Sequence, residues 1–148
     1  MTISVIAILA PVIAPQDPLK IDVTKRLQPP SSQHFMGTDH LGRDLFSRVM
    51  FGARISLMVG ITIAFISFVL GGALGLLAGY FGKLVDNIIM RICDMFFAFP
   101  PLILAMAIAA SLGPSLQNTM LSLVIVWWPR YARLVRSQVL VLRELDYV

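Results

Sequence analysis

Two long windows of the chain contain no charged residue. The first runs from Ile55 to Gly82 over 28 residues, and the second from Met95 to Pro129 over 35 residues. Because about 20 apolar residues in a helix cross the hydrocarbon core of a bilayer, the first window predicts one membrane span. The second window is interrupted by Gly113-Pro114-Ser115 and predicts two spans joined by a tight turn. The expected fold class is an all-α, polytopic membrane helix bundle.

The first 15 residues form a shorter apolar stretch, with Pro11 and Pro15 near its end. A signal peptide carries Lys or Arg ahead of its apolar core, whereas the first basic residue here is Lys20. We therefore favour a partial first transmembrane helix over residues 1–15, with a signal peptide as the alternative.

Residues 16–54 are polar, and their pattern changes halfway. Three prolines predict an extended first half. From Leu41 onward, apolar residues recur at helical spacing, which predicts an amphipathic helix at the membrane surface leading into the first span.

Two features support a helix in this second half. Thr38-Asp39 stands where a capping residue is expected. The pairs Asp39–Arg43 and Asp44–Arg48 have the i,i+4 spacing of helical ion pairs.

Composition excludes an ordinary soluble domain. Hydrophobic residues make up 57% of the chain and charged residues only 14%, with a mean hydropathy of +0.82. The net charge of +4 comes from basic residues that flank the apolar windows, so it indicates topology and contact with the lipid bilayer rather than nucleic acid.

The basic residues do not by themselves decide the orientation, since six precede Ile55 and six follow it. The turn around Gly113 has none, and the arginines near the C-terminus directly follow Trp127-Trp128, an aromatic pair typical of a membrane interface. We therefore expect the C-terminal side to lie in the cytoplasm.

The span predicted over 55–82 carries glycine at every fourth position, at Gly71, Gly75 and Gly79. A helix face nearly bare of side chains lets another helix backbone approach closely in lipid. The pattern predicts a helical partner without naming it, and general bundle packing with no transport role is the alternative.

The next span contains polar and helix-breaking residues. Arg91 and Asp94 are three positions apart and are expected to pair with each other. Phe99-Pro100-Pro101 predicts a kink or break in the helix. Cys93, the single cysteine, is expected to be a small buried side chain.

No residue pattern indicates catalysis. His34 and His40 lie near Asp39 and Asp44, but their spacing favours a solvated loop over a metal site. There is no activated nucleophile and no glycine-rich phosphate loop. We therefore expect no enzyme activity, no cofactor and no metal, and any ATP to be hydrolysed by another chain.

Several motifs in order resemble a known family. The run from His34 to Asp44, His-Phe-Met-Gly-Thr-Asp-His-Leu-Gly-Arg-Asp, is similar to the signature of peptide and nickel ABC transporter permeases, in the subunit like the dipeptide and oligopeptide permease C components. The similarity continues through Gly71–Gly82 and Trp128–Arg133 and covers nearly everything from Gln33 onward. The signature residues are Gly37, Thr38, Asp39, Gly42, Arg43 and Asp44.

The resemblance implies a partial type I ABC importer permease (MetI-like) fold. It assigns 16–54 to an extracytoplasmic segment and 55–148 to the first part of the transmembrane domain, with about three spans, cut before the coupling helix that docks on the ATPase. Asp146-Tyr147-Val148 looks like the opening of that coupling motif. The implied coupling candidates are Arg143, Glu144, Asp146 and Tyr147, and the implied cytoplasmic interface is Arg130, Arg133 and Arg136.

The resemblance also implies partners and a location. These are a second, usually non-identical permease subunit, two ATP-binding subunits and an extracytoplasmic solute-binding protein, all at the cytoplasmic (inner) membrane. The solute could be a dipeptide, an oligopeptide, a nickel chelate or another small solute. The alternatives are a component of a secondary transporter or channel and, if the gene ends at Val148, a nonfunctional remnant or membrane scaffold.

Overall fold

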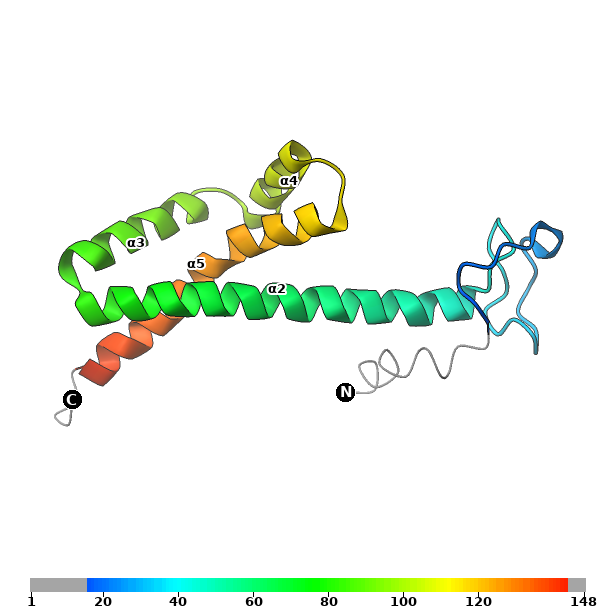
Figure 1. The fold of residues 1–148 in the computed structure, drawn as a ribbon, viewed down its shortest axis with the longest axis horizontal. Coiled ribbons are helices and arrows are strands. Elements are labelled where there is room, and N and C mark those ends of the chain that lie inside the picture. Colours follow the sequence, from blue (N-terminus) through cyan, green and yellow to red (C-terminus); the bar gives the residue numbers. More distant parts are fainter. Residues whose placement is uncertain (1–15, 144–148) are drawn as a thin grey trace. The chain divides into compact units, whose positions relative to one another are not determined.

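A computed structural model describes residues 16–143 of the chain (Figure 1). Within this range there is no β-strand, which agrees with the all-α prediction. The predicted partial first helix, at residues 1–15, and the coupling candidates Glu144, Asp146 and Tyr147 lie outside the described residues. The elements are a short 3-10 helix η1 (Val23–Lys25) and four α-helices, α2 (Leu45–Phe81), α3 (Lys83–Phe97), α4 (Pro101–Leu112) and α5 (Leu116–Arg143).

The chain divides into two compact units, Met1–Gly60 and Ile61–Val148. In the first unit, a loop leads into α2, which begins at Leu45. The side chain of Asp44 caps this helix, because its Oδ2 accepts the N–H of Ser47 at 2.8 Å. The prediction that Thr38-Asp39 forms the cap is therefore wrong.

The reason is that the residues from Thr38 to Asp44 form a tight turn. Thr38 and Asp44 face each other in an isolated antiparallel bridge. The backbone N–H of Asp39 donates to the carbonyl of Arg43 at 3.0 Å, and Gly42 supplies a positive φ of 73°. These residues therefore form a local turn and not the first turn of the helix that their spacing predicted.

Of the two ion pairs predicted in the stretch from Asp39 to Arg48, one forms and the other does not. Asp39 and Arg43 do pair, at 2.8 Å, although they lie in the turn and not in a helix. The Asp44–Arg48 pair is wrong, because Arg48 instead contacts Asp39. The amphipathic stretch from Leu45 onward is the start of α2 itself and not a separate helix, since α2 runs unbroken to Phe81.

Among the described helices, α2 alone is long and apolar enough to cross a membrane. The pair α3 and α4 meets the same criterion together, with a bend of 89° between them. This bend lies at the predicted proline break, and Pro101 starts α4. With 12 residues, α4 is about 18 Å long, which is shorter than the hydrocarbon core of about 30 Å. The number of spans stays a prediction.

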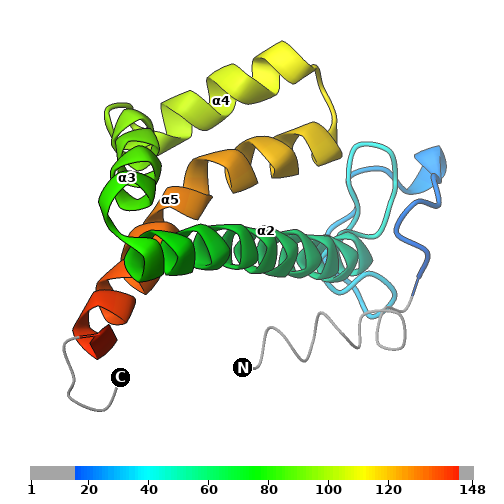
Figure 2. The same ribbon diagram turned by 60° about the vertical axis from the view of Figure 1, so that its left-hand side comes forward.

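In the second unit, α5 lies beside α4 and also beside α3 (Figures 1 and 2). The turn between α4 and α5 falls at Gly113, as predicted, where φ is 91°. Cys93 is fully buried, which confirms it as a small core side chain. The core of this unit consists of Ala78, Ile89, Cys93 and Ala132, with Leu74, Met90 and Trp128 packed against them.

Candidate functional site

The glycine face of α2 packs directly on the backbone of α5. A Cβ atom built on Gly75 would lie 2.3 Å from the carbonyl oxygen of Ala132, and one on Gly71 would lie 2.3 Å from that of Trp128. At Gly79 the obstacle is the side chain of Val139, at 2.7 Å. Only glycine permits this approach, so the structure identifies α5 as the partner that the sequence left unnamed.

Ser67 extends the same face by one turn. It stands four residues before Gly71 and is completely buried. Its hydroxyl has no hydrogen-bond partner among the described residues. The glycine pattern alone does not include Ser67; the signal in the sequence is a small residue four positions before Gly71, on the same helix face.

An adjoining side of α5 is held to α3 by two ion pairs. Arg136 contacts both carboxylate oxygens of Asp86, and Arg133 contacts Asp94. The predicted Arg91–Asp94 pair is therefore wrong. Asp94 takes its partner from a helix 39 residues further along the chain, which a local pattern cannot indicate.

Aromatic rings lie along the same α3–α5 contact. Phe96 packs edge-to-face on Trp128, with ring centroids 5.7 Å apart. The guanidinium of Arg133 lies 4.2 Å from the centre of the Phe97 ring. Arg130 lies 4.9 Å above Trp127, on its own helix. Of the three arginines predicted at a cytoplasmic interface, Arg133 and Arg136 thus bind carboxylates within the chain.

Arg143, the one coupling candidate among the described residues, is directed at α2. Its Nη1 donates a hydrogen bond to the backbone carbonyl of Gly79 at 2.8 Å. Gly79 lies in the last turn of α2, where carbonyl groups lack intrahelical donors. The family resemblance implied that Arg143 couples to the ATPase subunit, whereas this contact lies within the chain.

In the first unit, the signature residues build an ordered loop around buried polar groups. His34 and Asp44 are almost fully buried, and Nδ1 of His34 lies 3.0 Å from Oδ1 of Asp44. Since the other oxygen of Asp44 caps α2, one carboxylate joins the loop to the helix. Ser47 is completely buried at the same place.

Asp39 is the second buried carboxylate that holds this loop together. It accepts the backbone N–H groups of Leu41 and Arg43, at 2.8 and 3.0 Å, and ion pairs from the side chains of Arg43 and Arg48. Burial opposes the charge, but these hydrogen bonds outweigh it and hold the pKa of Asp39 far below its ordinary value. Burial likewise opposes the charge of Asp44, and bonds from Ser47 and His34 lower its pKa.

Two signature glycines are required by the backbone. Gly37 has a φ of 74°, and a Cβ there would lie 2.4 Å from the carbonyl oxygen of Gln28. At Gly42 the same atom would lie 1.7 Å from the carbonyl oxygen of Asp22. Thr38 completes the loop, because its hydroxyl accepts the N–H of Gln28 at 2.9 Å. The six signature residues are therefore accounted for as scaffold of this loop, and within the described residues no cluster could hold a metal ion.

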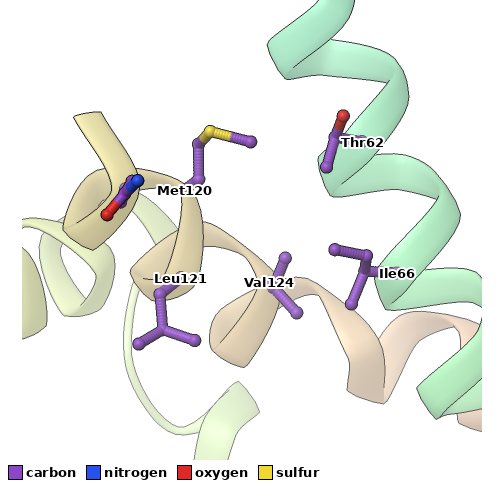
Figure 3. A pocket seen from close by; sticks show the side chains of 6 residues that line it. Thr62, Ile66, Met120, Leu121 and Val124 are labelled. Carbon is purple, nitrogen blue, oxygen red and sulfur yellow. The ribbon is translucent and has the colours of Figure 1, made fainter.

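A groove of about 230 Å³ lies between α2 and α5 in the second unit (Figure 3). Thr62 and Ile66 line it from α2, and Ile66 points toward Val124 of α5. Met120, Leu121 and Gln117 complete the wall from α5. With only a hydroxyl and an amide as polar groups, this groove suits an apolar side chain or a lipid chain and holds no ionisable group.

Comparison with known proteins identifies the class to which this helical unit belongs. Residues 71–148, more than half of the chain, match the family described as binding-protein-dependent transport system inner membrane component. The chain belongs to this family, and the resemblance inferred from its motifs is confirmed. The match covers α3, α4 and α5 and the glycine face of α2.

Individual relatives agree with this class. The chain is 50% identical over 141 residues to a probable D,D-dipeptide transport system permease protein of Escherichia coli, covering 95% of this chain and 47% of that protein. It is 46% identical over 143 residues to a dipeptide transport system permease protein of Alkalihalophilus pseudofirmus, with 97% and 47% covered.

A third relative carries another solute in its name. The glutathione transport system permease protein of Pectobacterium atrosepticum is 49% identical over 119 residues, covering 80% of this chain and 40% of that protein. The chain thus spans about half the length of the curated relatives it matches.

Proposed function

We propose that this chain is part of the transmembrane permease subunit of an ATP-driven importer for dipeptides, oligopeptides or similar small solutes. The observation that carries the proposal is the family match over residues 71–148. The names of the relatives support the solute class, since D,D-dipeptides, dipeptides and glutathione are all short peptides. The chain contributes passage and coupling, and the energy comes from other subunits.

The contacts of α5 support a mechanical role. The helix is packed against the bare face of α2 and is also bound to α3 by ion pairs. Three helices joined in this way move together, as the rigid elements of a transporter do in alternating access. The proposed partners are a second, non-identical permease subunit, two ATP-binding subunits and an extracytoplasmic solute-binding protein.

The proposed orientation places residues 16–54 outside the cytoplasm and the C-terminal end of α5 inside. The basic residues of α5 follow its aromatic pair, as the positive-inside rule requires of a cytoplasmic end. Single cysteines at Thr24 and at Ser137, in a Cys93→Ser background, test this orientation. A membrane-impermeant thiol reagent added to intact cells should label the first position and leave the second unlabelled; the reverse pattern contradicts the orientation.

Uptake measurements test the function itself. The gene that encodes this chain is expressed with its candidate ATPase, second permease and binding-protein genes in cells that lack peptide uptake, and a labelled dipeptide is supplied. We expect accumulation that is lost when the ATPase carries a substitution that abolishes hydrolysis. Uptake that persists with the inactive ATPase supports a secondary transporter or channel. No uptake despite normal membrane levels of every component contradicts the importer.

A further inference from the structure

The corner between α2 and α3 is contacted by one face of α5. The corner consists of Gly82 and Lys83, both with positive φ, at 60° and 42°. Positive φ is unfavourable for a residue such as Lys83, and such backbone persists where surrounding contacts hold it in place. The residues that flank the corner are contacted by Arg136, Val139 and Arg143, which stand at positions i, i+3 and i+7 of α5 and so share one face.

The two arginines of this face hold the two sides of the corner. Arg136 binds Asp86, in the first turn of α3. Arg143 donates to the carbonyl of Gly79, in the last turn of α2. A Cβ built on Gly82 would lie 3.6 Å from Nη1 of Arg143, so the guanidinium is directly beside the bend. The corner is therefore connected to α5 on both of its sides.

The chemistry of the Arg143 contact suits a lasting connection. The C-terminal end of a helix carries a partial negative charge and free carbonyl groups, and a cation there is favourable. Gly79 has no side chain, so α5 comes close enough for the arginine to reach the carbonyl. The donor and the acceptor are 64 residues apart in the sequence, and the bond closes the loop of chain between them.

We propose that Arg143 is a positioning residue that transmits movement between the C-terminal end of α5 and the α2–α3 corner. The inference rests on the proposed function, because transmission matters in a transporter whose ATPases act on the cytoplasmic side. Arg143 then acts through α2 and does not itself dock on the ATPase. Arg136 supports the other side of the corner through Asp86.

The contact is tested without any transport assay. Amide hydrogen exchange is measured over residues 82–86 in the purified protein in lipid nanodiscs, for the wild type, R143Q and R143K. We expect amides in this segment to exchange about tenfold faster in R143Q. Without the hydrogen bond from Arg143 to the Gly79 carbonyl, the corner is no longer held to α5 and opens more often. R91Q serves as a matched control, since Arg91 is an exposed cation on α3. Equal exchange in R143Q and wild type overturns the proposal.

The transmission is tested in the assembled importer, by measuring solute uptake and ATP hydrolysis in the same proteoliposomes. We expect R143Q to hydrolyse ATP within about twofold of wild type while uptake per ATP falls about tenfold, a typical size for coupling between sites. R143K keeps a cationic donor and should recover part of this loss. R91Q should match the wild type in both measurements.

Other outcomes assign the residue differently. If R143Q loses bound ATPase, hydrolysis and uptake together, Arg143 is a docking residue and the proposal is wrong. If R143K is no better than R143Q, the hydrogen bond is not what transmits movement, which also overturns it. If the wild type imports nothing, the proposed function fails, whereas the exchange experiment still decides whether Arg143 holds the corner.

Discussion

The two units of this chain are stabilised by opposite means. In the loop of the first unit, polar side chains are buried and bound, above all Asp39 and Asp44. In the helical unit, the decisive feature of α2 is the lack of side chains at Gly71, Gly75 and Gly79. A loop backbone needs side-chain partners for its N–H groups, whereas a helix has already satisfied its own and gains most from close packing.

This difference determines which substitutions each unit tolerates. The loop should be sensitive to the loss of an oxygen acceptor, and the helical unit to the gain of a carbon atom.

The largest effect is expected from Gly75→Leu. The first side-chain carbon alone would lie 2.3 Å from the carbonyl oxygen of Ala132, so α2 and α5 must separate. Overpacking costs about 1–3 kcal/mol, and this substitution belongs at or above the upper end. Unfolding in detergent measures it, with Gly60→Leu as the control, because a Cβ at Gly60 meets nothing within 4 Å. Equal stability of the two variants would show that α2 and α5 do not pack on this face.

In the loop, Asp44→Ala should cost about 2 kcal/mol. It removes the cap of α2 and leaves buried His34 without its partner. Asp44→Asn keeps an oxygen acceptor of the same size and should cost less. Amide exchange at Ser47 reports on the cap directly. If Asn and Ala variants are equally unstable, the negative charge and not the cap supports the loop.

The ion pairs between α3 and α5 should differ from each other in strength. Asp86 and Arg136 are largely buried, whereas Asp94 and Arg133 are about half exposed. A double-mutant cycle on the first pair, with Asn and Gln replacements, should show a coupling of about 1 kcal/mol. The same cycle on the second pair should give about 0.5 kcal/mol or less. A larger coupling in the exposed pair would contradict this ranking.

Acid should loosen the loop before it affects the contacts of the glycine face. The folded-state pKa of Asp39 is lowered, so its stabilisation is complete above the ordinary value of 3.8 and is lost as the pH falls below it, through the lowered pKa. Proteolysis of the loop by an acid-active protease between pH 5 and pH 2 measures the change. Asp39→Asn should remove much of this pH dependence. A variant as pH-dependent as the wild type would assign the effect to other carboxylates.

The smallest effect is expected from Arg91→Gln. The side chain is exposed, and Asp94 binds Arg133 instead. A surface substitution of this kind changes the unfolding free energy by about 0.5 kcal/mol or less. Thermal unfolding of the Arg91→Gln and Arg133→Gln variants, measured in parallel, compares the two possible partners of Asp94. A larger loss at Arg91 than at Arg133 would restore the pairing that the sequence suggested.

Much of the fold follows from local patterns. The uncharged window from Ile55 to Gly82 lies almost entirely within α2, and the turn at Gly113 and the break at Pro100 occur where the residues predict them. Burial of Cys93 was also foreseen. These features depend on the conformational limits of a few neighbouring residues, and such limits can be read without knowing the path of the chain.

The two errors in the loop have a common cause. Asp39 was expected to cap a helix and Asp44 to pair with Arg48, but a turn around Gly42 exchanges their roles. Helical spacing continues into this turn in the sequence, so the pattern could not show where the helix begins. The first residue of a helix depends on which side chain reaches its free N–H groups.

By itself, the sequence determined that the chain belongs in a membrane, where its helices break, and that α2 has one bare face. These properties reside in single segments. Only the tertiary structure decided that α5 covers this face, that Asp86 and Asp94 bind arginines of α5, and that Arg143 reaches Gly79. Those partners are 39 to 64 residues apart, and charge and size alone allow several pairings. The fold selects one pairing because it brings particular helix faces into contact.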